Sequence, residues 1–247
     1  MYSQFDNIHD FLAEYSKRYA DMEINERNIK GLEHVRLSES ELIYLIDFSS
    51  NGISFAKGFK EFLGFDDKLM TLEKYMDQMH PEDIDLVSRI GKATILHTSD
   101  NLKDSINDVL YISFRIKNKE GNYLKVLSQS SVFELDKKGN MISSLVKVSD
   151  LSFMGENEVV KYKLLAANLD EEKFRKEIFG ANYDLFTPRE LEIIQEIEKG
   201  LTNIEIGTLL DISKHTVASH RKKIMKKSEC HSRDELLKFC RRNGVLQ

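Results

Sequence analysis

The strongest constraint on the fold is a pattern that occurs three times near the end of the chain, a hydroxyl residue followed three positions later by glutamate. The pairs are Thr187 with Glu190, Thr202 with Glu205, and Ser232 with Glu235. In such a capping box the hydroxyl accepts a hydrogen bond from the third helical N–H, and the glutamate accepts one from the N–H of the cap residue. Because these N–H groups have no partner within the helix, each pair marks a favourable helix start. The pattern therefore predicts three helices in one short segment.

The residues around the first two pairs predict where these helices end. Pro188 stands at the first helical position, where its missing N–H costs nothing, and Gly200 stands where a left-handed exit is needed. The first helix is expected at about 188–199. A second is expected at about 203–210, followed by a short polar turn at 211–213.

The segment that follows this turn is strongly basic. Residues 214–227 hold six Lys and Arg residues and no acidic residue, and Ser213 can cap them as a helix. Val217 and Ile224 fall on one side of that helix. The opposite stripe consists of His215, Ser219, Lys222 and Lys226. A helix with an apolar inner face and a cationic outer face, placed after a helix and a tight turn, fits the major groove of B-DNA.

Three blocks of this region resemble one known family. TPRELEII, GLTNIEIGTLLDIS and TVASHRKKIMKK occur in the order and spacing of the LuxR/FixJ-type DNA-binding domain. The resemblance covers about 183–243 and implies a four-helix module whose third helix enters the major groove.

The resemblance also implies a role for each exposed residue of the third helix. The residues expected to contact mainly phosphates are Thr216, Arg221, Lys223 and Lys226. The positions that address base edges are Ala218, Ser219 and Lys222, with His215 on the same outer stripe. Ala218 offers only a methyl group, so it can contact a thymine methyl but cannot donate a hydrogen bond. Two departures from the family, Ile204 in place of a basic residue and Ser228 in place of a core leucine, are expected to weaken local packing.

The middle of the chain shows a different periodicity. Short apolar strands are expected at 41–48 and 53–56, helical pieces at 58–65 and 69–79, a helix from His80 to about 97 with Pro81 in its first turn, and then three strands with turns at Gly121 and Gly139. This order of two strands, several helices and a three-stranded meander is α+β.

The same stretch, about 40–152, resembles a PAS domain. The pieces that carry the resemblance are LIDFSSNGISFA, FLGF followed by MHPEDIDLV, and SFRIKNKEGNYLKVLSQSSVFELDKKGN. PAS domains share a fold more than a ligand, so the resemblance implies sensing or dimerisation and no particular chemical. It also places Asp150 in an Asp-containing motif that couples the sheet to the following helix, which implies a role in signal coupling.

Two further segments are predicted to be helical. Residues 1–30 carry an amphipathic stripe that packs either on the chain's own next domain, which we favour, or on a second subunit. Residues 155–182 are charged and helix-prone and are interpreted as a connecting helix. This helix either fixes the spacing between two DNA-binding domains or moves when the sensor changes; the alternative is a passive linker packed on the PAS sheet.

Charge is unevenly divided along the chain. Residues 183–247 contain 12 Lys and Arg against 10 Asp and Glu, and residues 1–182 contain 24 against 31, giving net charges of +2 and −7. A nearly neutral domain with one basic helix implies modest non-specific affinity, so DNA binding is expected to need two copies on one site. Cys230 and Cys240 are interpreted as two reduced thiols, since no second pair completes a zinc site.

Residues of the PAS-like segment that could hold a ligand are interpreted mainly as structural. His80 opens a helix, and His97 is expected to be solvated at the end of that helix. The aromatic residues are expected to fill the core, with a pocket as the alternative; they are Phe55, Phe59, Phe62, Phe65 and Phe114. Cysteinyl-flavin chemistry needs a cysteine in this domain, and none is present. The cofactor is left unknown.

The predicted fold class is α+β, a PAS-like antiparallel sheet with flanking helices followed by an all-α four-helix LuxR-type helix-turn-helix domain. The predicted segments are an amphipathic helical segment at 1–36, a PAS-like sensory or dimerisation domain at 37–152, a helical linker at 153–182 and the helix-turn-helix domain at 183–247.

The predicted function is that of a cytoplasmic, homodimeric transcriptional regulator that binds double-stranded DNA and is controlled by the PAS-like domain. A small-molecule ligand of that domain stays open. No signal peptide or membrane segment is predicted. No catalytic residue, Gly-rich phosphate loop, metal-ligand cluster or receiver-like acidic pocket is found in the sequence, so an enzyme is not expected. The alternative is an interaction module whose helix-turn-helix contacts RNA polymerase or another protein.

Overall fold

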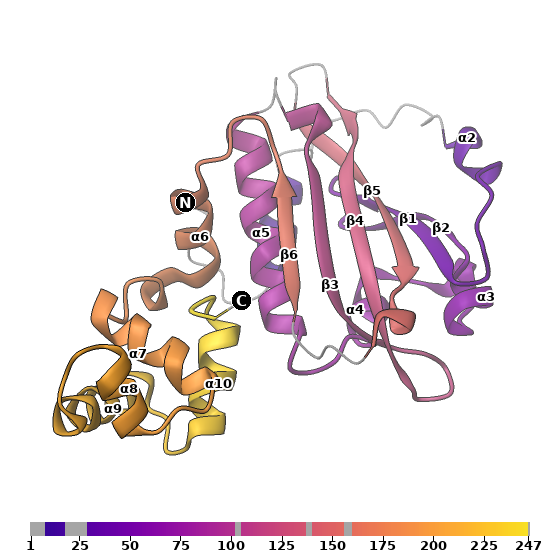
Figure 1. The fold of residues 1–247 in the computed structure, drawn as a ribbon. Helices are drawn as coiled ribbons and strands as arrows, with labels where there is room; N and C mark the ends of the chain where they lie inside the picture. Colours follow the sequence, from indigo (N-terminus) through magenta and orange to yellow (C-terminus); the bar gives the residue numbers. More distant parts are fainter. Residues whose placement is uncertain (1–7, 18–28, 102–104, 137–139, 156–159, 247) are drawn as a thin grey trace. The chain divides into compact units, whose positions relative to one another are not determined.

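The computed structural model describes residues 8–17, 29–101, 105–136, 140–155 and 160–246. The chain divides into two compact units, Met1–Phe174 and Arg175–Gln247. The first contains a sheet with helices packed against it, and the second is helical (Figure 1). Part of the expected helix 1–30, including Tyr19 and Met22, lies outside the described residues. The turn expected at Gly139 also lies outside them.

The first unit is built on a six-stranded antiparallel sheet with the order β2-β1-β5-β4-β3-β6 (Figure 1). Its strands are β1 (Glu41–Asp47), β2 (Gly52–Lys57), β3 (Val109–Lys117), β4 (Tyr123–Leu135), β5 (Met141–Asp150) and β6 (Lys161–Leu165). The helices of this unit are α1 (Ile8–Ser16), α2 (Lys30–Glu33), α3 (Phe59–Leu63), α4 (Leu72–Met76) and α5 (Ile84–Asp100). The first five strands and the helices between β2 and β3 confirm the predicted PAS-like α+β fold.

The N-terminal helix α1 packs on its own unit. Phe11, Leu12 and Tyr15 are buried in a cluster that includes Phe48 of the first hairpin. The Tyr15 hydroxyl lies 2.8 Å from the hydroxyl of Ser99 on α5. The described part of the predicted amphipathic helix therefore covers its apolar stripe within the same chain, as favoured from the sequence.

A buried ion pair joins the start of α5 to the sheet. Asp83 is almost completely buried and accepts hydrogen bonds from the backbone N–H, Nε and Nη2 of Arg115 on β3, at 2.8, 3.1 and 2.6 Å. Since its carboxylate is used in this way, Asp83 does not cap α5. The helix begins at Ile84, so the expectation that Pro81 lies in its first turn was wrong.

The segment between the sheet and the C-terminal unit is only partly helical. Lys161–Leu165 forms strand β6, which pairs with β3, and a helix follows only at Glu171–Phe179 (α6). The prediction of a connecting helix over the whole of 155–182 was therefore wrong. Alternating exposure along β6, with Leu164 buried and its neighbours exposed, explains why the sheet captures this segment.

The His97 side chain is largely buried, which contradicts the expectation of a solvated side chain. The helix continues three residues beyond it to Asp100, and the His97 side chain is only 10 % exposed. Its ring lies edge-on to Phe174, with 6.4 Å between ring centroids. Its Nε2 atom lies 3.6 Å from the carboxylate of Asp108. The burial of His97 results from the continuation of α5 beyond it and from the neighbouring ring of Phe174, and the local sequence indicated neither of these.

The second unit is a bundle of short helices around one apolar core. They are α7 (Pro188–Glu198), α8 (Asn203–Leu209), α9 (Lys214–Ser228) and α10 (Arg233–Arg242). Buried isoleucine, valine and leucine side chains from all four helices pack together, including Ile193, Ile206, Val217, Ile224 and Leu236. This arrangement confirms the four-helix domain expected from the sequence.

Replacing Arg115 by Met is expected to destabilise the first unit by about 3–5 kcal/mol, because the Asp83 carboxylate would stay buried without its cation. Lys173→Met is the matched control. It removes a cation from an ion pair with Asp100 in which both side chains are largely exposed, and its effect is expected to stay below about 1 kcal/mol. Chemical denaturation of both variants measures the difference, and equal effects would contradict the structural role of Asp83.

Candidate nucleic-acid interface

A complete capping box starts α7. The Thr187 hydroxyl accepts from the N–H of Glu190, and Glu190 accepts from the N–H of Thr187 at 2.9 Å. Glu190 is only 3 % exposed, and it also accepts from Nζ of Lys227 on α9 at 2.6 Å. Burial acts to raise the pKa of Glu190, but the hydrogen bonds from Lys227 and Thr187 outweigh it and lower the pKa below its ordinary value. One carboxylate thus satisfies the start of α7 and fixes the far end of α9.

The second box and the turn that follows α8 bring α9 into position. Thr202 and Glu205 cap α8 reciprocally, as predicted. A Cβ atom at Gly207 would lie 2.7 Å from the carbonyl oxygen of Ile212, so α8 approaches the turn more closely than any larger residue allows. Asp211 takes a left-handed conformation with φ of 54°, which reverses the chain in few residues. The need for glycine at position 207 arises from this close approach and was missed in the sequence.

Helix α9 has the two faces predicted for a recognition helix. Ser213 caps it by accepting from the N–H of Thr216 at 3.0 Å. Val217 and Ile224 are fully buried in the core. The expected contact residues that are exposed are His215, Thr216, Ala218, Ser219, Lys222, Lys223 and Lys226. In the described part of the chain, Lys222, Lys223 and Lys226 form no ion pair, so their charges are available to a ligand.

Arg221 and Lys227 are used within the domain. Nη1 of Arg221 donates to the side-chain oxygen of Asn203 on α8 at 2.9 Å, and Arg221 is partly buried. Lys227 binds Glu190. The structure therefore separates the basic segment into two cations that hold α9 to its neighbours and a set that faces outward.

The third predicted capping box forms only in part. Ser232 accepts from the N–H of Glu235 at 3.2 Å, but the Glu235 carboxylate accepts from the N–H of His231 instead of that of Ser232. The reciprocal half of the prediction was wrong, because the carboxylate reaches one residue further back. The helix start itself was correct, since α10 begins at Arg233.

The two departures from the family pattern occupy different environments. Ile204 is 64 % exposed on α8, where it packs little. Ser228 is buried at the end of α9 and its hydroxyl donates to the carbonyl of Ile224 at 2.9 Å. The weakened packing expected at Ser228 thus concerns a core position, whereas Ile204 lies at the surface.

Cys230 and Cys240 are free thiols, and burial raises the pKa of Cys240 to about 12.

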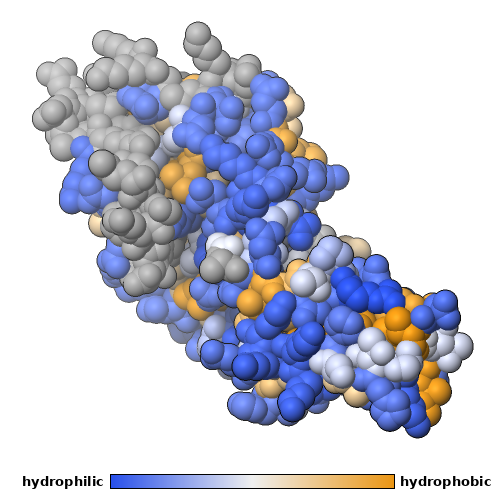
Figure 2. All heavy atoms as spheres, turned by 90° about the vertical axis from the view of Figure 1, so that its left-hand side faces the viewer, coloured by the Kyte–Doolittle hydropathy of each residue, from blue (hydrophilic) through white to orange (hydrophobic). Residues whose placement is uncertain are grey.

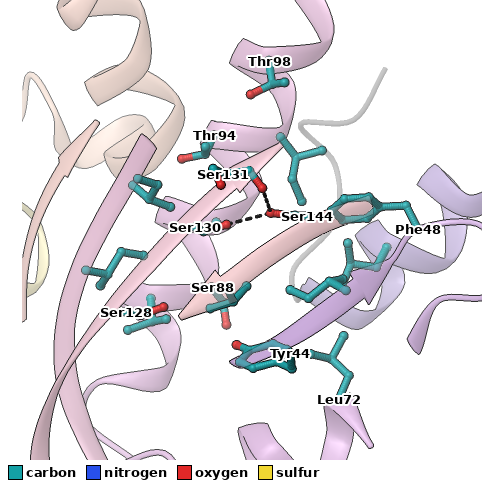
Figure 3. A pocket seen from close by; sticks show the side chains of 18 of the residues that line it. Tyr44, Phe48, Leu72, Ser88, Thr94, Thr98, Ser128, Ser130, Ser131 and Ser144 are labelled. Carbon is teal, nitrogen blue, oxygen red and sulfur yellow. Dashed lines mark hydrogen bonds between the residues drawn. The ribbon is translucent and has the colours of Figure 1, made fainter. Parts of the chain in front are cut away.

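A second candidate site is a cavity of about 150 Å³ inside the first unit. It lies between the sheet and the helices, and serine side chains of β4 and β5 face Thr94 and Thr98 of α5 across it (Figure 3). Of the five phenylalanines considered from the sequence, Phe114 lines this cavity and Phe59 is buried outside its lining. The sequence alternatives of a filled core and a pocket are therefore both realised in part.

Two capped helices, a tight turn and a third helix with an exposed basic face form a helix-turn-helix arrangement. Residues 184–240 match the family described as bacterial regulatory proteins, luxR family. This segment of the chain is a LuxR-family domain.

Curated relatives share part of the chain. It is 42 % identical over 80 residues to the uncharacterized response regulatory protein YgeK of Escherichia coli (strain K12), covering 32 % of this chain and 53 % of the relative. It is 41 % identical over 63 residues to the transcriptional regulatory protein ComA of Bacillus subtilis (strain 168), covering 26 % and 29 %. The chain thus spans about half or less of these relatives.

Among solved structures, a phage VqmA–DPO complex aligns over 95 % of this chain and 91 % of its own, with 13 % identity and a TM-score of 0.36. The PAS-like assignment rests on the strand order and the helices described above.

The hydrophobic side chains visible in Figure 2 gather in separate patches among hydrophilic ones. None of the described helices has the length and apolar character needed to cross a membrane.

Glu190→Gln is expected to destabilise the second unit by about 1–3 kcal/mol at neutral pH, because it removes the charge from a buried acceptor of three hydrogen bonds. Folding lowers the pKa of Glu190, so its contribution is present above the ordinary carboxyl pKa of 4.5 and is lost as the pH falls through the folded value. The difference in Tm between the wild type and the variant should shrink below about pH 4. Glu192→Gln, in an exposed pair on the same helix, is the control and should change Tm little at any pH.

Gly207→Ala is expected to destabilise the second unit by about 1–3 kcal/mol and to weaken DNA binding, because the new methyl group would displace the backbone before α9. Gly91→Ala on α5 is the matched control. Its Cβ meets nothing within 4 Å, so the usual helix preference for alanine should stabilise the first unit by up to about 1 kcal/mol. Calorimetry of both variants and a DNA-binding titration test the pair; an unchanged Gly207→Ala variant would contradict the close approach.

Proposed function

We propose that this chain is a sequence-specific transcriptional regulator that binds double-stranded DNA through α9. The observation that carries the proposal is the outward face of α9, on which Lys222, Lys223 and Lys226 are exposed while the opposite face is buried. A helix held in this way can enter the major groove with its polar side chains against base edges and phosphates. In this arrangement Ala218, Ser219, Lys222 and His215 address bases, and Thr216, Lys223 and Lys226 contact phosphates.

Arg221 contributes differently from the other basic residues. Its hydrogen bond to Asn203 holds α9 against the start of α8. A guanidinium has five N–H donors, so Arg221 can keep this bond and donate to a phosphate as well. It is proposed as a phosphate contact that is oriented in advance by Asn203.

The active species is proposed to be a homodimer. A single module offers few phosphate contacts, and its domain has a net charge of only +2 against −7 for the rest of the chain. Since affinity for DNA rises with the number of neutralised phosphates, two modules on one site provide affinity that one does not. A two-fold symmetric protein then selects a two-fold symmetric operator.

The PAS-like segment, residues 37–152, is proposed to act as the sensor that controls the helix-turn-helix at 183–247, with 1–36 and 153–182 as flanking segments. The cavity between its sheet and α5 supports a ligand-responsive role. Asp150 is proposed as a coupling residue: at the end of β5 its carboxylate accepts from the N–H of Ser152 at 2.7 Å. A change in β5 would thereby reach the segment that leads to β6.

One observation favours a protein partner such as RNA polymerase in addition to DNA. Ile204 and Leu209 on α8 are 64 % and 59 % exposed, which is high for large apolar side chains. Binding through several phosphates falls steeply with salt, whereas an apolar protein contact does not, so salt dependence separates these two uses of the domain.

Lys222→Ala is expected to reduce the preference for the specific DNA sequence, by about 1–3 kcal/mol at the base pairs it contacts. Lys226→Ala should weaken specific and non-specific binding alike and reduce the salt slope by about 1. The measurement is selection of bound sequences from a random DNA pool, followed by titration of the enriched and scrambled sequences at two salt concentrations.

Lys238, on α10 outside the basic face of α9, provides the control position: Lys238→Ala should leave both quantities nearly unchanged. An enriched two-fold symmetric motif is the expected outcome for the wild type. If Lys222→Ala lowered specific and non-specific binding equally, the division of roles between bases and phosphates would be wrong.

A further inference from the structure

The cavity of the first unit is lined by residues from both the helices and the strands of the PAS-like fold. Its lining includes Leu12 of α1, Thr98 of α5, Ile112 of β3, Ser128 of β4 and Val146 of β5. At about 150 Å³ it has the size of a cavity that holds a single small ring, so it excludes nucleotides and flavins. Most of the lining is apolar, and such a surface favours a flat hydrocarbon or heteroaromatic body.

Several hydroxyl groups of the lining already have partners within the protein. The Ser144 hydroxyl donates to the Ser131 carbonyl and lies 2.8 Å from the Ser130 hydroxyl (Figure 3). The Thr94 hydroxyl donates to the carbonyl of Ile90. These groups therefore need no ligand to satisfy their donors.

Two lining residues, Tyr75 and Asp108, each have a buried oxygen without a hydrogen-bond partner among the described residues, and of the two only Asp108 carries a carboxylate. It is only 6 % exposed, yet its Oδ2 atom has no hydrogen-bond donor in the part of the chain that the structure describes. The Nε2 atom of His97 lies 3.6 Å from this oxygen, beyond hydrogen-bond distance. A buried carboxylate oxygen without a donor is costly, and native proteins rarely leave one so unless a ligand, ion or water completes it.

We propose that this cavity binds a compact, planar organic cation whose N–H group donates to Asp108 while its ring packs against the apolar walls. The inference rests on the proposed sensory function of the same unit and names the chemical class of its ligand. A carboxylate or phosphate ligand is excluded by repulsion from Asp108, and an aliphatic hydrocarbon would leave the carboxylate without a donor. The N–H donor and the positive charge together satisfy the Asp108 carboxylate oxygen that has no donor among the described residues.

The test uses the purified full chain and two probes of the same shape, 4-aminopyridine and toluene, each with about seven non-hydrogen atoms. At about pH 8 the first is a planar cation with N–H donors, and the second is its apolar counterpart. Their effects on the Tm of the first unit are measured by calorimetry for the wild type and for Asp108→Asn, because a ligand that binds only the folded state raises Tm. Asp100→Asn, at an exposed ion pair on α5, is the control variant.

In the wild type and in Asp100→Asn, 4-aminopyridine should bind, and in Asp108→Asn its affinity should fall roughly tenfold or more. Toluene should raise Tm equally in all three, which shows that the cavity of Asp108→Asn is intact. Equal binding of 4-aminopyridine to all three, or binding of neither probe to the wild type, would overturn the proposal. Because these readouts involve no DNA, their failure is distinguishable from failure of the regulator function, which the DNA selection tests.

Discussion

The cost of burying a carboxylate organises both units of this protein. A carboxylate removed from water needs hydrogen-bond donors and a nearby cation. Where a distant part of the chain supplies them, the resulting ion pair fixes the position of that part relative to the element that carries the carboxylate. Asp83 receives three hydrogen bonds from Arg115 and ties the start of α5 to β3. Glu190 accepts hydrogen bonds from Thr187 and Lys227 and thereby connects α7 to α9. Asp108 is buried to a similar degree, but its Oδ2 has no such donor among the described residues.

In the C-terminal unit this constraint positions the surface that we propose contacts DNA. Lys227 is held by Glu190 and Arg221 donates to Asn203, so two cations of the basic segment attach α9 to α7 and α8. The close approach at Gly207 sets the separation of α8 from the turn. The exposed lysines are then presented by a helix whose position is already determined, which reduces the ordering that DNA binding would otherwise require.

In the N-terminal unit the sheet contains one strand more than the five predicted from the sequence. The edge of β3 pairs with β6, so a segment with helical composition becomes a sixth strand. Helix α1 closes another side of the unit through Phe11, Leu12 and Tyr15, and Leu12 also lines the cavity. The cavity is consequently bounded by elements that lie far apart in the sequence, which suits a unit proposed to convert ligand binding into a change elsewhere in the chain.

Local patterns in the sequence determined the helix starts at Thr187 and Thr202, the buried and exposed faces of α9, and the order of the PAS-like elements, because capping and periodicity depend on residues a few positions apart. Only the tertiary structure decided that Lys161–Leu165 is a strand, that His97 is buried beside Asp108, that Lys227 belongs to Glu190, and that Gly207 cannot carry a side chain. Each of these depends on a partner distant in the sequence or across a tight turn. Local propensity does not encode such partners, since packing and the pairing of buried charges are settled only when the chain is folded.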